Sequence, residues 1–592
     1  MSFFAELKRR NVLRAGALYI GAAWALSQGV AQLLPVFDFP NWVVRWFVFA
    51  ALIGFPFAML FSWFYEWTPQ GIQRESDVEQ DASVTREAGK KMDRWIIAVL
   101  SVAVVLLLAN TFALHKDENS ATATHSPINN KSIAVLPFVN MSGDPQNDYF
   151  SDGITEEILN ALAQVPNLKV AARTSAFAFK GKEEDLRKVG EVLGVATVLE
   201  GSVQKSGDEV RITAQLIDTR SGYHLWSERY DRKLTNIFAI EAEISNSITD
   251  KLKLQWRNDA TQSLLARKTV GSRAHDFYLR GLPLIAARGP GLREAVADFQ
   301  QAVAIDPDYA QAWAALAEAQ ILLPHYFLAP QETAFPSGEA AANRALAIDP
   351  DTAAAHVALA MMYRIQWNWK DADDAFQRAL KIAPGDAEAA DQYGQFLLAE
   401  GRLSEALTQI DHAQRLDPLS GIIGATRTNV LTALHRFDDA NKQAQAVVTG
   451  HPDYALGHFI AADVAIYRGE YSASKDQFHA AAALVGENPD VYMLLLNALA
   501  DPAQRPAARR AILAAANDTH QRLSAPAKIK WLMLLGDHDD ALDELQRIGH
   551  DVMFGQDNVW QPAFDPVRDD PRFKTALKRM GLPAAPNGAD PR

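Results

Sequence analysis

The 592-residue chain contains no cysteine, which excludes disulfides, cysteine-ligated zinc and thiol nucleophiles. Because an oxidising compartment permits disulfides without requiring them, this absence fits the periplasm and the cytoplasm equally well. Positive charge is not in excess either: the formal net charge is -13, which argues against nucleic acid as a partner. A glycine-rich phosphate loop, an H-E-x-x-H motif and a G-x-S-x-G motif are also missing. The sequence therefore predicts that the chain is not an enzyme and needs no cofactor or metal.

Long apolar runs are present only near the N-terminus. Three of them, at about 15–36, 42–64 and 95–114, reach the length of about 20 residues that a helix needs to cross a bilayer. Tryptophans lie near their ends, as is typical of membrane interfaces. These runs predict a membrane anchor of three transmembrane helices within residues 1–114.

Basic residues predict the orientation of this anchor. They precede the first run and fill the loop at 66–94, whereas the short turn at 37–41 has none. Since excess positive charge marks the cytoplasmic side, the N-terminus should be cytoplasmic. Three crossings then place the bulk of the chain in the periplasm. The predicted location is the bacterial inner membrane, with the lipid bilayer as one partner.

Small residues recur every four positions in the first two runs. They are Ala17, Gly21, Ala25, Gly29, Ala50, Gly54 and Ala58. This spacing lets two helix backbones approach closely. It could serve self-association into a homo-oligomer, or simply the packing of the three helices within one chain, which we favour.

Beyond a polar linker at 115–131, residues 132–256 alternate between strand and helix patterns. Apolar runs predict strands at 133–138, 168–172, 196–204, 210–218 and 222–230. Helical spacing predicts helices from an N-cap at Asp152, at 184–193 and at 237–254. Mixed elements over this length predict one compact α/β domain.

The residues of this domain resemble a known family. The runs SIAVLPFVNMSGDPQNDYFSDGITEEILNAL, LKVAARTSAFAFKG and VATVLEGSVQKSGDEVRITAQLIDTRSGYHLWSERYDR resemble the TolB-N-like (FlgO-like) domain. That domain occurs in bacterial tetratricopeptide-repeat (TPR) proteins, often beside a CadC-type regulator or an adenylate-cyclase module. The resemblance implies an α/β fold and a periplasmic or signalling context, but not an enzyme.

Eleven positions match the pattern of this family. They are Tyr149, Ser151, Asp152, Gly153, Glu156, Arg173, Glu200, Gly201, Ser202, Arg211 and Trp226. They could form a ligand-binding face. We favour structural roles instead: capping, turn formation and core packing. Arg173, Glu200 and Arg211 could also form a structural ion-pair network.

A fixed period governs residues 271–580. Pro350, Pro384, Pro418 and Pro452 are each 34 residues apart, which is the TPR period. Small and large apolar residues fall at the TPR positions between them, where they let two antiparallel helices touch. The longer step from Pro307 to Pro350 predicts an insertion around 325–336. The sequence thus predicts an all-α TPR superhelix with a closing helix near 565–577.

A TPR superhelix binds extended or helical peptides along the first helix of each pair. Helical phase predicts six residues there: Arg364, Asp391, Gln395, Asn429, His458 and Asp463. At the positions of the carboxylate clamp of chaperone-binding TPR proteins, the chain has Val357, Asp391 and Ala425, and only Asn429 agrees. A chaperone C-terminus is therefore a poor candidate partner.

Together these patterns predict a membrane-anchored periplasmic scaffold or sensor that binds a protein partner through a TPR groove. The alternative is a transmembrane signalling relay, in which the TolB-N-like domain acts on a separate cytoplasmic effector such as a cyclase or a transcription regulator. An enzyme acting on a small molecule would need a pocket with strongly perturbed titratable groups in the α/β domain.

Overall fold

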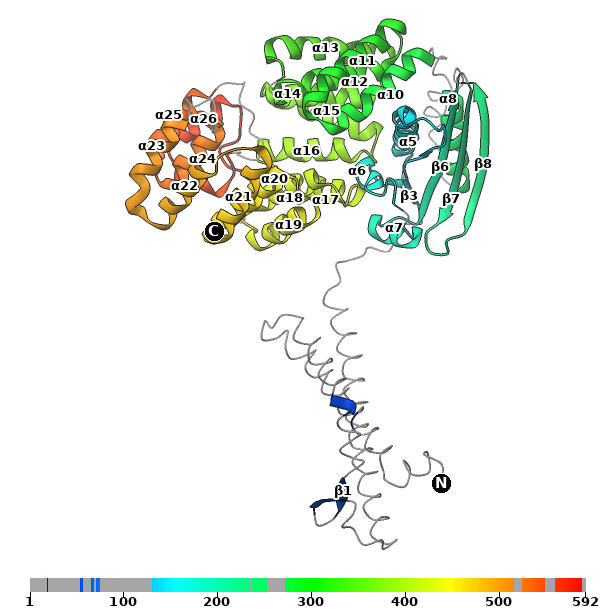
Figure 1. The fold of residues 1–592 in the computed structure, drawn as a ribbon. Helices are drawn as coiled ribbons and strands as arrows, with labels where there is room; N and C mark the ends of the chain where they lie inside the picture. The colour runs from blue at the N-terminus through cyan, green and yellow to red at the C-terminus, as the bar shows by residue number, and fades with distance from the viewer. Residues whose placement is uncertain are drawn as a thin grey trace. The chain divides into compact units, whose positions relative to one another are not determined.

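The computed structural model describes Tyr19, residues 54–56, 65–68 and 71–74, and residues 130–587 except 183, 208, 234–236, 253–271, 327, 516–523 and 549–558. The chain divides into two units, Met1–His125 and Ser126–Arg592. Within the second unit, the sheet and the helical pairs are labelled in Figure 1. Each unit is described by itself.

In the first unit, the described residues include a short hairpin. Strand β1 (Tyr65–Thr68) pairs antiparallel with β2 (Gly71–Arg74), in a segment predicted to be a loop. Gly54 lies against Tyr19, because a Cβ at position 54 would meet the Tyr19 hydroxyl. The other predicted packing residues, Ala17, Gly21, Ala25, Gly29, Ala50 and Ala58, lie outside the described residues.

The predicted fold class is wrong in its transmembrane part. Of the helices that the structure describes, none combines the length and the apolar character needed to cross a membrane. The longest of them, α13, has 18 residues, which is fewer than the roughly 20 that a span needs. Nearly all residues of the three predicted spans lie outside the described part. The described chain is mostly helical, with a small sheet region and TPR-like helical repeats.

The sheet region has six strands, listed here in chain order. They are β3 (Ser132–Val135), β4 (Val139–Asn140), β5 (Lys169–Val170), β6 (Thr197–Ser206), β7 (Glu209–Asp218) and β8 (His224–Lys233). Their order is β5-β3-β6-β7-β8, with β4 also beside β6. Strands β5, β3 and β6 are parallel, and β6, β7 and β8 are antiparallel neighbours. Strands thus form within each predicted range.

Helices cover both faces of this sheet. They are α5 (Asp148–Ala163), α6 (Arg173–Phe177), α7 (Leu186–Leu193) and α8 (Ile237–Lys251). Alternation along β3 sends Ile133 and Val135 into the core that α5 and α8 share. Ala134 joins Val189 and Leu193 of α7 in the second core. The period of two in a strand explains this division.

The start of α5 differs from the prediction. The helix begins at Asp148, so Asp152 lies inside it and is not its N-cap. The turn η3 (Pro145–Asn147) precedes the helix and is capped by the side chain of Asp144. The carboxylate of Asp152 instead pairs with the ammonium group of Lys180 at 2.6 Å.

Consecutive helices pack in pairs through the rest of the chain. The helices are α10 (Ser272–Ala287), α11 (Leu292–Ile305), α12 (Ala310–Leu322), α13 (Gln331–Ile348), α14 (Ala353–Ile365), α15 (Trp369–Ile382), α16 (Ala387–Glu400), α17 (Leu403–Leu416), α18 (Gly421–Ala433), α19 (Phe437–Gly450), α20 (Ala455–Tyr467), α21 (Tyr471–Val485), α22 (Asp490–Ala500), α23 (Arg505–Ala515), α24 (Ala525–Leu535), α25 (His538–Arg547) and α26 (Pro571–Arg579). Where the sequence predicted an insertion, at 325–336, the chain has the turn η6 (Pro324–Tyr326) and the start of the longer helix α13.

Small residues allow the two helices of a pair to touch. Gly394 of α16 is in van der Waals reach of α17, because a Cβ there would collide with the Ile410 side chain. Ala372 and Phe376 of α15 are fully buried. The 34-residue pattern therefore marks residues that the packing of helix pairs requires.

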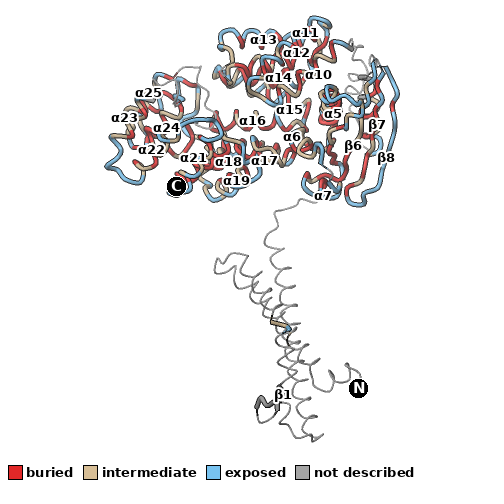
Figure 2. The backbone as a smooth tube through the Cα atoms, viewed as in Figure 1, coloured by how far each residue is buried: buried red, intermediate tan, exposed pale blue. Residues whose placement is uncertain are grey.

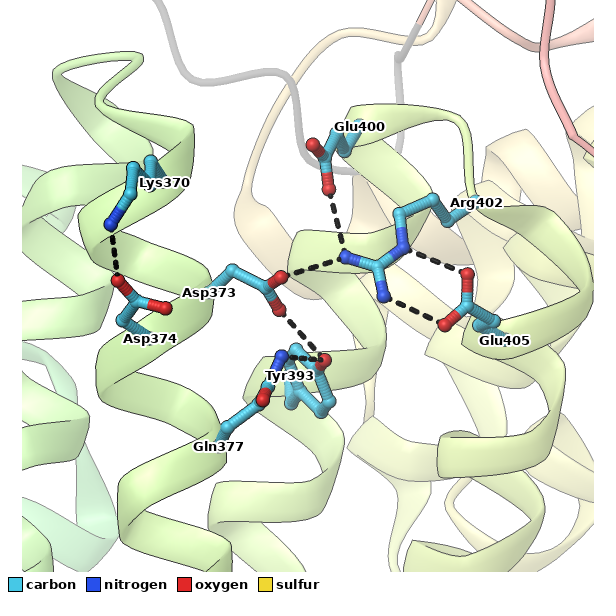
Figure 3. Close-up of polar contacts among 8 residues, drawn as sticks. All are labelled: Lys370, Asp373, Asp374, Gln377, Tyr393, Glu400, Arg402 and Glu405. Atoms are coloured by element: carbon cyan, nitrogen blue, oxygen red, sulfur yellow. Dashed lines mark hydrogen bonds and ion pairs between the residues drawn. The ribbon is translucent and has the colours of Figure 1, made fainter.

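A polar network joins three consecutive helices at the end of α16 (Figure 3). The guanidinium of Arg402 donates to both carboxylate oxygens of Glu405, at 2.8 and 2.7 Å, and to Asp373 of α15 at 3.0 Å. The Tyr393 hydroxyl of α16 donates to the same Asp373 at 2.7 Å. This network holds α15, α16 and the start of α17 in register.

The α/β region is continuous with the array. One hydrophobic cluster includes residues of the sheet, α5, α10 and the helical pairs, and buried residues run through all of these elements in Figure 2. At the start of the array, the Tyr278 hydroxyl of α10 donates to Glu157 of α5 at 2.9 Å. Further along, the Gly385 amide after α15 donates to the Ala163 carbonyl at 3.2 Å.

The turn after α17 makes a second, buried contact with the α/β region. The Ala172 amide donates to the Leu416 carbonyl at 2.8 Å. The Ser175 amide donates to Asp417 Oδ1 at 3.0 Å, and its hydroxyl donates to the same oxygen. The Leu419 amide donates back to the Ser175 hydroxyl at 2.9 Å. The α/β region therefore contacts the array at points far apart in the sequence.

The C-terminal segment also returns to the array. After the turn η8 (Pro562–Val567) comes α26, which packs on α25. Trp560 is fully buried and its indole donates to the Ala399 carbonyl at 2.9 Å. The Trp369 indole donates to the Met580 carbonyl at 2.6 Å. This segment thus contacts the start of α15 and the end of α16, whereas the α/β region meets the turn between the end of α15 and the start of α16.

Candidate functional site

The first helices of five successive pairs, α12, α14, α16, α18 and α20, contact one another in sequence. We call the surface that they form the first-helix face. Solenoids of helix pairs bind partners along the concave surface that such helices build. The six residues predicted to line the groove all belong to α14, α16, α18 and α20.

Three of the six form a hydrogen-bonded chain across α14 and α16. The Arg364 guanidinium donates to Gln395 Oε1 at 3.2 Å, and the Gln395 amide donates to Asp391 Oδ2 at 2.8 Å. Gln395 and Asp391 are one helical turn apart, which aligns them on one face of α16. Arg364 and Gln395 are half-buried, whereas Asp391 is only 3 % exposed.

The surroundings shift the pKa values of the two ionisable groups at the ends of this hydrogen-bonded series. Burial raises the pKa of Asp391 to about 6, and hydrogen bonds from Gln395 and Thr426 oppose that shift. Burial lowers the pKa of Arg364 to about 10, although the charge of Asp391 favours the protonated guanidinium. Gln395 links the two groups without direct contact between their charges. The side-chain amide of Gln395 therefore bridges Arg364 and Asp391, which do not form an ion pair with each other.

A second polar cluster adjoins these residues. Arg288, between α10 and α11, pairs with Glu318 of α12 at 3.1 Å and also with Glu388 of α16. Burial, followed by the charge of Glu388, raises the pKa of Glu318 to about 7. Sequence reasoning missed Arg288 because it lies in a turn, where it adopts a left-handed backbone at φ 60°, and helical phase says nothing about turns.

The other three predicted residues are used elsewhere. The His458 ring contacts Gln477 of α21 at 2.7 Å and the Pro452 carbonyl at 3.0 Å, so it packs within its own helix pair. Asp463 pairs with Lys530 of α24 at 2.7 Å. Asn429 is half-buried, and its carbonyl accepts a hydrogen bond from Gln561 at 3.5 Å.

In the α/β region, Arg173 and Arg211 do not share one ion-pair network. Arg173 pairs with Glu156 at 2.8 Å, and Arg211 pairs with Asp231 across β7 and β8. Gly201 of β6 has a packing reason to be glycine, because a Cβ there would collide with the Thr213 carbonyl. Among the residues that the structure describes, no group of three or more His, Asp or Glu side chains is arranged to hold a metal ion.

Comparisons with known proteins give partial matches. No model of a protein family matches the chain. "Putative adenylate cyclase 3" of Rhizobium meliloti (strain 1021) is 45 % identical over 186 residues, which are 31 % of this chain and 32 % of that protein. "Transcriptional regulator HilA" of Salmonella typhimurium is 21 % identical over 325 residues, which are 54 % of this chain and 57 % of that protein. The chain thus spans about a third and about three fifths of these relatives.

Solved TPR-like structures resemble parts of the chain. A crystal structure described as YrrB, a TPR protein with an unusual peptide-binding site, matches 31 % of this chain and 91 % of that one, at 19 % identity and a TM-score of 0.25. The type IV pilus biogenesis factor PilW matches 39 % of this chain and 91 % of that one, at 17 % identity and a TM-score of 0.28.

Proposed function

We propose that this chain is a protein-interaction scaffold that binds a segment of a partner protein on the first-helix face. The observation that supports the proposal is the chain of Arg364, Gln395 and Asp391. Side chains from two consecutive first helices meet there, and two of them are half-buried rather than enclosed. Such groups can exchange hydrogen bonds with the backbone of an extended segment.

A signalling role is the second candidate. The similarity to a protein described as "Putative adenylate cyclase 3" and to a transcriptional regulator favours an effector of one of these kinds as the partner. In that case the α/β region would relay a signal to the effector through its contacts with the array. The scaffold and the relay then differ in whether binding changes the activity of the bound protein.

The location at the bacterial inner membrane, with the bulk of the chain in the periplasm, remains a prediction from the sequence. Its test is protease treatment of spheroplasts, followed by detection of a tag at the C-terminus. Loss of the tag in intact spheroplasts is the expected result. A tag that is cut only after lysis would contradict the periplasmic location.

Photo-crosslinking tests the proposed binding face. A photoreactive amino acid at Gln395 should form a crosslink to a specific protein in the cells that produce the chain. The same amino acid at Arg378, which is exposed on the second helix α15, is the matched control and should give none. Equal crosslinking from both positions, or crosslinking from position 378 alone, would contradict binding on the first-helix face.

A further inference from the structure

Arg364 has an unusual set of partners for a half-buried arginine. Its guanidinium makes one hydrogen bond, to the amide oxygen of Gln395 at 3.2 Å. Within the described part of the chain, no carboxylate lies within ion-pair distance of it. A guanidinium carries five N–H donors in a planar fork, so the described residues use only a minority of its donors.

Other arginines near the first-helix face are paired with acids. Arg288 lies between Glu318 and Glu388, and Arg427 of α18 pairs with Asp411 at 2.8 Å. Removing water from a guanidinium is unfavourable unless a carboxylate or similar anion replaces the lost hydrogen bonds. Arg364 is the exception in this set, because its partner is a neutral amide.

The electrostatic surroundings leave this positive charge only partly compensated, by the charge of Asp391, which does not contact it. Burial lowers the pKa of Arg364 to about 10. Loss of solvent, followed by the charges of Arg364 and Arg288, lowers the pKa of His325 to about 4, although the residue as a whole is exposed. His325 is therefore neutral at pH 7 and adds no positive charge beside the guanidinium.

We propose that Arg364 binds the carboxylate of an Asp or Glu side chain in the partner segment, with Gln395 holding the guanidinium in place. This inference rests on the proposed function of the first-helix face. A side-chain carboxylate is favoured over a chain terminus because the terminal-carboxylate clamp positions here hold Val357, Asp391 and Ala425. Fork-to-fork pairing with a carboxylate would occupy donors that the chain leaves unused.

Asp391 provides an internal test of this arrangement. Its carboxylate is buried behind Gln395, and its charge acts on Arg364 without contact. A carboxylate bound at Arg364 would be repelled by Asp391. The variant Asp391→Asn should therefore bind an acidic segment more tightly than the unmodified chain, an effect that a purely structural role of Asp391 would not produce.

The experiment uses the full chain and a synthetic library of random twelve-residue peptides with amidated C-termini. Peptides selected by the unmodified chain should share an Asp or Glu at one position. Replacing that residue by Asn or Gln should weaken binding by about 10- to 100-fold, as expected for hydrogen bonds to a charged group. Arg364→Gln should cause a similar loss, and the two losses should not add.

Matched variants keep this test decisive. Arg378→Gln, on an exposed site of α15, should leave binding unchanged. If Arg364→Gln does not fold, Arg364→Lys replaces it, because lysine keeps the positive charge without the planar guanidinium. The affinity of Arg364→Lys for the acidic peptide should lie between two values: that of the unmodified chain for the same peptide, and that of the unmodified chain for the peptide lacking the acid. Peptides without a shared acid, or Arg364 variants that bind the acidic peptide normally, would overturn the inference.

The two proposals fail in different ways. If the selected peptides crosslink to position 395 but share no acid, the inference about Arg364 is wrong and the binding face stands. If no peptide is selected, or if the selected peptides crosslink only away from the first-helix face, both proposals are wrong. A parallel library with free C-termini completes the test: binders that are selected from it and lose binding when amidated would also overturn the inference.

Discussion

Replacing Asp417 with alanine should detach the α/β region from the turn after α17. Asp417 is 4 % exposed and accepts hydrogen bonds from the amide and the hydroxyl of Ser175, which is fully buried. Each unsatisfied buried donor costs about 1–3 kcal/mol, and hydrogen bonds to a charged group contribute about 1.5–3 kcal/mol each. The loss at this contact should therefore reach about 3–5 kcal/mol.

Hydrogen exchange measures this loss locally, without the assumption that so long a chain unfolds in one step. The amides of residues 172–176 should exchange about 100- to 4,000-fold faster in Asp417→Ala, because about 1.4 kcal/mol corresponds to a factor of ten. Ser175→Ala keeps the backbone hydrogen bond and should lose about 1.5–3 kcal/mol. The double variant should lose much less than the sum, since both changes remove one interaction.

Asp411→Ala, on the helix α17 that precedes this turn, is the matched control. Its carboxylate is 38 % exposed and pairs with Arg427, and such exposed pairs contribute about 0–1 kcal/mol. Exchange at residues 172–176 should not change in this variant. Unchanged exchange in Asp417→Ala, or an equal increase in Asp411→Ala, would refute the view that this buried contact joins the two regions.

Three other changes test the charges and the packing of the array. Burial raises the pKa of Asp391 from 3.8 to about 6, so the folded chain holds this proton more tightly than the unfolded chain. The free energy of unfolding should therefore fall as pH rises from about 4 to about 6.5. Asp391→Asn should remove up to about 3 kcal/mol of that pH dependence, as measured by thermal unfolding at each pH. Trp560→Ala should lower the free energy of unfolding by about 3–5 kcal/mol and speed amide exchange at residues 399–402, whereas normal exchange there would show that the C-terminal segment does not hold this turn. Arg402→Lys should lose the paired hydrogen bonds to the two carboxylate oxygens of Glu405 and lower the thermal midpoint by the equivalent of about 1 kcal/mol. An unchanged midpoint would mean that the network in Figure 3 adds no stability.

The helical pairs could be predicted from the sequence because their cause is local and repeated. Each proline of the 34-residue series comes two residues after a helix end: Ile348, Ile382, Leu416 and Gly450 are the last residues of α13, α15, α17 and α19. The small residues between them recur because every pair needs a close crossing. The same regularity placed Arg364, Gln395 and Asp391 on the first helices of their pairs, but the hydrogen bonds between them were not predicted.

Contacts between distant segments could not be predicted in this way. Helical phase placed Asp463 on the first-helix face, but it could not show that Lys530, far along the chain, would pair with it. Likewise, nothing near Ser175 indicates Asp417 as its partner. Hydropathy was misleading for the fold class: length and apolar character predicted spanning helices, and the helices that the structure describes do not meet those criteria.

These distant contacts bear on how the first-helix face could bind. In a solenoid each repeat contacts only its neighbours, so the spacing between first helices can vary at little energetic cost. Here the α/β region contacts the turns after α15 and α17, and the C-terminal segment contacts the start of α15 and the end of α16. The helix α16, which carries Gln395, is therefore contacted at both of its ends. Because ordering a flexible surface reduces affinity, such bracing favours a face that is organised before its partner arrives. Asp417→Ala tests this idea. Asp417 lies in the turn beyond α17 and contacts the α/β region, away from the first-helix face. If these contacts organise the site, the variant should nevertheless weaken peptide binding on the first-helix face.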